Sequence, residues 1–293
     1  MEKKHTRERS SQKKNHSHHW VYVNIPLTNF VPELVMLGHA HYRHAVPLTE
    51  HHHSGSFEFV FVEKGKVSWK IEDTTYETRA GDIFHTKPDE VHLGNFNIIE
   101  PCQIWWLILK SPNPQGWLRL TPEEITVLQQ KLQVLPRIVP TGILIASQFK
   151  KLLEAIEGMD PFRTITTQNS LLDVLFAILR PKNSSTIADD LQMQLQRLIE
   201  HMELHPEWRP TIEQLAVHIS VSPSHFYRTF QEYTGLTPMS YMERIRIEAA
   251  CRLLKESDIS ITKLAYDLGY QTSQHFATVF KRFIGATPSS WRE

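Results

Sequence analysis

A helical pattern of apolar residues occurs twice near the C-terminus of this chain. Apolar residues three and four positions apart form one face of a helix. The first copy contains Ile212, Leu215, Ala216, Ile219, His225, Phe226, Phe230, Gly235, Thr237 and Pro238. The second copy contains Ile261, Leu264, Ala265, Leu268, His275, Phe276, Phe280, Gly285, Thr287 and Pro288. Equivalent residues of the two copies are 49 positions apart in the first helix of the unit and 50 positions apart in the second. The sequence therefore predicts one helical unit that is repeated.

Each copy has the layout of a helix-turn-helix, with a short first helix, a tight turn and a capped second helix. Ser222 is a suitable N-cap with Pro223 at the first helical position, and Thr272 takes the same place in the second copy. The buried stripe leaves one face of each second helix outward, and DNA-reading helices use such a face. The candidate base-reading residues are Ser224, Tyr227 and Arg228 in the first copy and Ser273, Gln274 and Thr278 in the second.

Residues 238–255 read as one long helix that joins the two copies. Two recognition helices held about 34 Å apart would enter successive major grooves, so one chain would read two adjacent half-sites of a double-stranded operator. Arg246 and Lys281 lie in or beside these helices and are further candidate DNA contacts. Residues 191–293 carry as many acidic as basic residues, which predicts modest non-specific affinity. The alternative is an all-helical interaction module.

Short strands follow one another between Phe57 and Lys110, with alternating apolar and polar residues and Gly or Pro between them. This pattern predicts an antiparallel sandwich or barrel. Amphipathic helices are expected at about 121–134, 142–157 and 162–179, where apolar stripes would form a dimer surface or pack on the barrel. The predicted fold class is therefore α+β and multidomain.

The domain boundaries follow from composition. Residues 1–19 are polar and basic, which predicts a disordered tail or an arm that folds over an effector or touches DNA. A β-rich domain is expected at 20–110, a helical region at 111–180, a linker at 181–190 and the DNA-binding domain at 191–293. The chain has no long apolar run and only two cysteines, Cys102 and Cys251, so we expect a cytoplasmic protein without membrane contact or a disulfide framework.

The repeated C-terminal stretch resembles the DNA-binding domain of the AraC/XylS family of bacterial transcription regulators. The resemblance rests on LAVHISVSPSHFYRTFQEYTGLTP and on YMERIRIEAACRLLKESDISITKLAYDLGYQTSQHFATVFKRFIGATPSSWRE. It implies base-reading roles for the six residues named above, an activator that contacts RNA polymerase, and a homodimer. Many relatives carry arginine where this chain has Thr278, so a bidentate contact to guanine is absent there.

The β-rich segment resembles a cupin, the usual sensor domain of that family. The resemblance rests on His51, His53, Glu58 and Gly65, followed by Gly81, Pro88 and His92. Together with nearby polar and aromatic residues these form an expected site for a small polar effector, most simply a sugar. The expected effector-binding residues are Arg43, His51, His53, Glu58, His92 and Trp106.

Imidazole and carboxylate are also ligands for iron, manganese or zinc. The alternative interpretation is therefore a divalent metal held by His51, His53, Glu58 and His92, as in a metal sensor or a metal-dependent cupin enzyme fused to a DNA-binding domain. No nucleophile elbow, phosphate-binding loop or zinc-hydrolase spacing occurs, so we expect a regulator without a cofactor and without catalytic activity. A third alternative is an architectural DNA-binding protein without a ligand.

Overall fold

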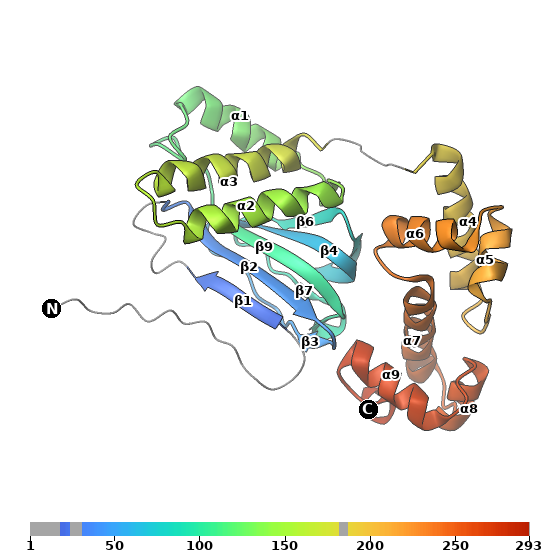
Figure 1. The fold of residues 1–293 in the computed structure, drawn as a ribbon. Coiled ribbons are helices and arrows are strands. Elements are labelled where there is room, and N and C mark those ends of the chain that lie inside the picture. The colour runs from blue at the N-terminus through green and yellow to red at the C-terminus, as the bar shows by residue number, and fades with distance from the viewer. Residues whose placement is uncertain (1–17, 24–30, 182–186, 293) are drawn as a thin grey trace.

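The computed structural model describes residues 18–23, 31–181 and 187–292 (Figure 1). A β-rich domain forms the N-terminal half, three helices cover one of its faces, and an all-helical domain forms the C-terminal part. This arrangement confirms the predicted α+β, multidomain fold class. We refer to the two parts as the sensor domain and the reader domain.

The sensor domain is built on an antiparallel sheet. Within the described residues its strand order is β1(His18–Val23), β2(Leu34–Tyr42), β9(Cys102–Lys110), β4(Ser56–Ile71), β6(Asp82–Thr86) and β10(Ile138–Pro140). The strands β5(Thr74–Arg79) and β7(Leu93–Gly94) also pair with β4. A separate two-stranded sheet contains β3(Val46–Pro47) and β8(Ile98–Ile99), next to the short helix η1(Asn95–Asn97).

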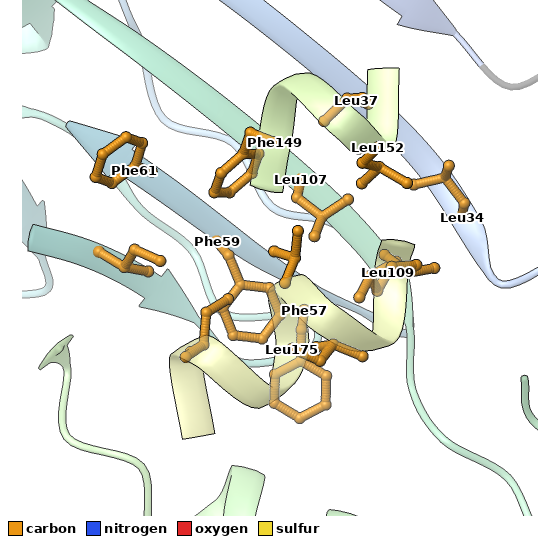
Figure 2. Close-up of a cluster of buried hydrophobic side chains, with 14 of the residues drawn as sticks. Leu34, Leu37, Phe57, Phe59, Phe61, Leu107, Leu109, Phe149, Leu152 and Leu175 are labelled. Carbon is orange, nitrogen blue, oxygen red and sulfur yellow. The ribbon is translucent and has the colours of Figure 1, made fainter. Parts of the chain in front are cut away.

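The two faces of this sheet carry separate cores, because successive side chains of a strand point to opposite faces. Phe57, Phe59 and Phe61 of β4 point to the face that the helices cover (Figure 2). Val60 and Val62 of the same strand point to the inner face, together with Trp69 and Phe84 among others. Glu58 also lies on the inner face, because it is two residues from Val60.

Three helices cover the outer face: α1(Pro122–Gln133), α2(Ala146–Glu157) and α3(Arg163–Leu179). Helix α2 follows a 3-10 turn, η2(Ile143–Ile145), and α1 begins at a capping box between Thr121 and Glu124. The predicted apolar stripes of α2 and α3 pack on the sheet, where Phe149, Leu152 and Leu175 meet the phenylalanines of β4 (Figure 2). These stripes are therefore core, and Phe176 of α3 remains 48% exposed.

The predicted domain boundaries can be compared with the structure at three places. Residues 1–17 of the predicted tail lie outside the described residues, and its last two residues, His18 and His19, belong to β1. Residues 182–186 of the predicted linker also lie outside the description. Helix α4(Asp189–Leu204) begins before the predicted end of that linker.

The reader domain contains the repeated unit that the sequence predicts. The first copy consists of α5(Ile212–His218) and α6(Pro223–Thr234), and the second of α8(Ile261–Asp267) and α9(Ser273–Ile284). Helix α7(Pro238–Glu256) joins them, and α10(Pro288–Arg292) follows the second copy. Each copy has its own core, centred on Phe226 and Phe230 in the first and on Phe276 and Phe280 in the second.

The recognition helices α6 and α9 begin and end in equivalent ways. Ser222 accepts a hydrogen bond from the amide of His225, and Thr272 accepts one from the amide of His275, which confirms both predicted N-caps. Gly235 and Gly285 end the helices with φ of 75° and 81°, a left-handed conformation that favours glycine. The repeat in the sequence is therefore a repeat of helix start, buried stripe and helix end.

Candidate functional site

The predicted base-reading residues lie on the outward faces of α6 and α9. Ser224 and Arg228 of α6 are exposed, and Tyr227 is 41% exposed. Gln274 and Thr278 of α9 are exposed as well, and Ser273 is half-buried. Each set lies on the side of its helix opposite to the buried phenylalanines, where it is available to a DNA groove.

Two hydrogen bonds modify these surfaces. Nη2 of Arg228 lies 3.3 Å from Nδ1 of His225, so His225 helps to orient the arginine. The i, i+3 spacing of the two residues is a feature of the sequence, but it does not by itself show that the two side chains meet. The hydroxyl of Thr278 donates to the carbonyl oxygen of Gln274 at 2.9 Å, so its only proton is already used within the helix.

Arg246 does not reach the DNA-reading surface, contrary to our prediction. Its side chain is 7% exposed, and its guanidinium donates to the carbonyl oxygens of Pro206 at 3.2 Å and of Trp208 at 3.1 Å. The face of α7 that carries Arg246 is covered by the segment between α4 and α5, so the arginine caps buried carbonyl groups. Lys281, in the last turn of α9, is exposed as predicted.

Three histidines and one glutamate converge on the inner side of the sensor. One ligand atom from each of His51, His53, Glu58 and His92 lies within 4.8 Å of the others. Nε2 of His92 is 2.9 Å from Oε2 of Glu58, and Nε2 of His53 is 3.5 Å from the same oxygen. We call these four residues the histidine cluster.

The local fold explains this convergence. His51 and His92 form an isolated antiparallel bridge, with the amide of each donating to the carbonyl of the other at 3.0 and 2.9 Å. Their rings lie 4.2 Å apart between centroids. His52, between the two ligating positions, is exposed, as the alternation of side chains predicts.

The charges in the cluster are coupled. Burial acts to raise the pKa of Glu58, but the adjacent His53 and His92 outweigh it and hold the pKa at about 2. Burial acts to lower the pKa of His92, but the Glu58 carboxylate outweighs this effect and raises it. Burial lowers the pKa of His51. The cluster therefore holds an ionised carboxylate against imidazole rings in a protected place.

The donor atoms of the cluster fit a divalent cation. The Nε2 atoms of His53 and His92 are buried and have no hydrogen-bond partner of suitable geometry within the described residues, although both lie near Glu58. A buried polar atom without a partner calls for a ligand, a water molecule or an ion. Three imidazoles and a carboxylate suit zinc, iron or manganese.

Trp106 lies on the same inner face as the cluster. The strand register pairs Trp106 with Val60, and Glu58 is the next inward residue of β4. The indole lies against Gly38, where an added Cβ would be 2.1 Å from the ring, so glycine is required there. Trp105 points to the other face, 5.7 Å from the ring of Phe149 in α2. Because adjacent residues of a strand point to opposite faces, only one of the two tryptophans can line an inner site.

Arg43 does not join the histidine cluster, which corrects its predicted effector contact. Arg43 comes directly after Tyr42, which pairs with Cys102 at one end of β9. Glu58 of β4 pairs with Ile108, near the other end of β9. Six residues of strand span about 20 Å. Arg43 is exposed at the end of the sensor that faces the reader domain, because the chain reverses direction between Arg43 and His51.

Comparisons with known proteins find one family model for each part of the chain, and the first match extends into α5 of the reader domain. A model described as "AraC-like ligand binding domain" matches residues 35–215, and a model described as "Helix-turn-helix domain" matches residues 215–293. The chain is 26% identical over 261 residues to the HTH-type transcriptional activator RhaS of Escherichia fergusonii, covering 83% of this chain and 87% of the relative. It is 28% identical over 250 residues to the RhaS of Salmonella arizonae, with the same coverage.

Among solved structures, the DNA-binding domain of AdpA in complex with a target DNA is 27% identical. That match covers 34% of this chain and 89% of the solved chain, with a TM-score of 0.33. In the part of the chain that the structure describes, no helix combines the length and the apolar character needed to cross a bilayer.

Proposed function

Because the chain belongs to the AraC family of transcription regulators, we propose that it is an activator that reads two adjacent DNA half-sites and responds to a small polar effector. The readers are the exposed residues of α6 and α9. The effector site is the histidine cluster with Trp106. Since the matched relatives are transcription activators, we expect regulation rather than catalysis.

One observation carries the effector proposal: His51, His53, Glu58 and His92 converge on the inner face that also holds Trp106. Imidazole and carboxylate groups donate and accept hydrogen bonds, and an indole ring packs on the apolar face of a sugar ring. This combination suits a mono- or disaccharide. A ligand of this kind would give the buried Nε2 atoms of His53 and His92 well-oriented hydrogen bonds, which their contacts with Glu58 do not provide.

Thermal unfolding of the full chain with a panel of mono- and disaccharides tests this proposal. A ligand that binds only the folded chain raises the unfolding temperature. We expect one sugar to raise it in the presence of a chelator, for wild type and for the His52→Ala control but not for His53→Ala. His52 is exposed and adjacent, so it controls for the change of a histidine in this segment. A sugar response that persists in His53→Ala would refute the assigned site.

A divalent metal is the second candidate for the same site, because the buried Nε2 atoms of His53 and His92 converge with the Glu58 carboxylate. His51, His53, Glu58 and His92 would hold the ion, which would supply a Lewis-acidic anchor for an oxygen-rich effector. Under this alternative a rise in unfolding temperature requires added Zn²⁺ or Mn²⁺, chelator removes it, and His53→Ala abolishes it. No response to sugar or metal would direct the search to other effectors.

The remaining partners follow from the family. We propose that the protein acts in the cytoplasm, where its DNA operator and RNA polymerase are found, and that it forms a homodimer. The chain's own part in activation is to hold both recognition helices on DNA when the effector is bound. The resulting shift in operator affinity cannot exceed the effector's differential affinity for the two conformations.

A further inference from the structure

Two segments of the sensor run together from the histidine cluster to the reader domain. The bridge between His51 and His92 is their first contact. The amide of Gly94 then donates to Leu48 at 3.2 Å, and the amide of Leu48 donates to Asn97 at 2.8 Å. The pairing of β3 with β8 continues the ladder. We call residues 45–51 and 92–99 the interdomain ribbon.

The far end of the interdomain ribbon contacts the second repeat of the reader. The amide of Ala45 donates to the carbonyl oxygen of Arg282 in α9 at 2.8 Å. Ile98 is 9% exposed and belongs to the same buried cluster as Phe280. The ring of Phe96 lies 4.8 Å from that of Trp291 in α10. Arg282 and Phe280 belong to α9 of the second copy and Trp291 to the helix that follows it, so the ribbon joins the cluster to α9 and α10 (Figure 1).

The first repeat contacts the sensor at a different place. The carbonyl oxygen of Gly235 accepts from the amide of Gly65 at 3.1 Å, and the guanidinium of Arg79 lies 4.4 Å from the ring centroid of Tyr233. Gly65 belongs to β4, whose first half pairs with β9 on one side and with β6 on the other. This contact therefore lies where the pairing of β4 with β9 ends, at Gly65 and Cys102, and outside the ribbon.

The tip of the ribbon is strained and has room to move. Phe96 and Asn97 both have positive φ, 58° and 60°, a conformation that asparagine tolerates but that is costly for a bulky residue such as Phe96. A cavity of ≈ 230 Å³ adjoins them, lined by Asn95, Phe96 and Ile98 and by residues of α7 and α9. Strained backbone beside an unfilled space can adopt a second arrangement, whereas a close-packed contact cannot.

From these contacts we propose that occupancy of the histidine cluster is transmitted through the interdomain ribbon to the second repeat, and so sets the position of α9 relative to α6. The inference rests on the proposed function of the cluster as the effector site. The effector then controls the second half-site contact, while the first recognition helix stays fixed to the main sheet. Coupling energy of this kind acts equally in both directions.

Hydrogen exchange measured by mass spectrometry on the full chain tests this path without any effector. His51→Ala removes the hydrogen bond from the ring to the carbonyl oxygen of Thr49 and the ring contact with His92. We expect about two- to thirtyfold faster exchange in the ribbon and in α9, with α6 unchanged. The matched control His52→Ala alters an adjacent exposed histidine and should change neither helix. A change that stops inside the sensor, or one of equal size in α6 and α9, overturns the proposal.

The reverse direction provides a second variant if His51→Ala fails to fold. Trp291→Ala removes the reader side of the contact with Phe96 and touches no residue of the cluster. Exchange at residues 48–53 and 90–94 should rise, whereas Tyr233→Ala, which removes the ring contact of the first repeat with Arg79, should leave those residues unchanged. Unchanged exchange in Trp291→Ala, or an equal rise in both variants, refutes the path. Failure of the effector proposal would appear separately, as the absence of any ligand response in thermal unfolding.

Discussion

The guanidinium of Arg244 and the carboxylate of Glu100 form an ion pair between the two domains, with Nη2 and Oε1 2.5 Å apart. Arg244 belongs to α7 of the reader, and it also donates to the carbonyl oxygen of Lys66 and the hydroxyl of Ser68 in the sensor. The arginine is 4% exposed. The helix that joins the two DNA readers is therefore tied to the sensor at its middle.

The first prediction concerns this ion pair. Arg244→Ala removes the partner of the Glu100 carboxylate, whose side chain is only 15% exposed. Removing one member of a buried ion pair costs about 3–5 kcal/mol. We expect the sensor and reader to unfold in two separate calorimetric transitions in this variant. Arg252→Ala, an exposed arginine of the same helix, should leave the unfolding of wild type unchanged. A single transition at the wild-type temperature in Arg244→Ala would contradict the role of this contact.

The second prediction concerns specific DNA recognition. Arg228→Ala should weaken binding to a selected operator by about 1–3 kcal/mol, the value of one good base contact. Arg197→Ala on α4 is the matched control, because Arg197 is exposed but lies outside both recognition helices. Thr278→Ala should have a smaller effect than Arg228→Ala, since the threonine hydroxyl is bonded within α9. Fluorescence anisotropy with a labelled duplex measures all three, and wild-type affinity in Arg228→Ala would mean that α6 is not the reader.

The local parts of the fold could be predicted from the sequence, because their signals are local. The caps at Ser222 and Thr272, the joining helix and the alternation along β4 each depend on residues a few positions apart. The histidine cluster was also predicted as a set, from its resemblance to cupin motifs, although His92 is 34 residues from Glu58 in the sequence.

The misplaced residues share one physical cause. Arg246 has the charge of a DNA contact, but its carbonyl partners Pro206 and Trp208 come from about 40 residues earlier in the chain, and only packing shows that they cover α7. Arg43 is close to His51 in sequence, but the chain between them turns back along the ribbon. The sequence shows which residues are charged, but tertiary contacts determine which of them are exposed to solvent.

The third prediction is a pH dependence that arises away from both sites. Glu63 accepts hydrogen bonds from Trp105 and Gln103, and His39 lies within 3.3 Å of the same oxygen. The hydrogen bond with His39 is the main reason that the pKa of Glu63 is lowered to about 2. A carboxyl with a lowered folded-state pKa stabilises the fold above its unfolded pKa, and this contribution is lost as the pH falls toward 2.

Glu63→Gln should therefore reduce the free energy of unfolding by about 1–2 kcal/mol at pH 7. The difference from wild type should shrink between about pH 4.5 and pH 2, where Glu63 of the unfolded chain and then of the folded chain is protonated. Urea unfolding at a series of pH values measures it. Glu154→Gln is a suitable control, because Glu154 is an exposed carboxylate of α2. A constant difference at all pH values would exclude the assigned ionisation.

The last prediction concerns the proposed homodimer. The stripes of α2 and α3 that pack on the sheet are not available to a second copy, but a groove of ≈ 520 Å³ remains between α1 and α3. Val127 and Phe176 line it and are 56% and 48% exposed. Its rim carries both signs of charge, with glutamates on α1 and Arg180 after α3, so the glutamates of one copy can face the arginine of another across a twofold axis. A second copy of this chain is therefore the occupant that we expect.

Phe176→Glu places a charge in the middle of this groove and should convert the dimer into a monomer, which light scattering after size exclusion would detect. Ile165→Glu is the matched control, because Ile165 is a 46% exposed apolar residue of the same helix that does not line the groove. If wild type is a dimer and both variants remain dimers, the interface lies elsewhere. If both variants become monomers, α3 as a whole rather than the groove carries the contact, because the two positions differ only in their relation to α1.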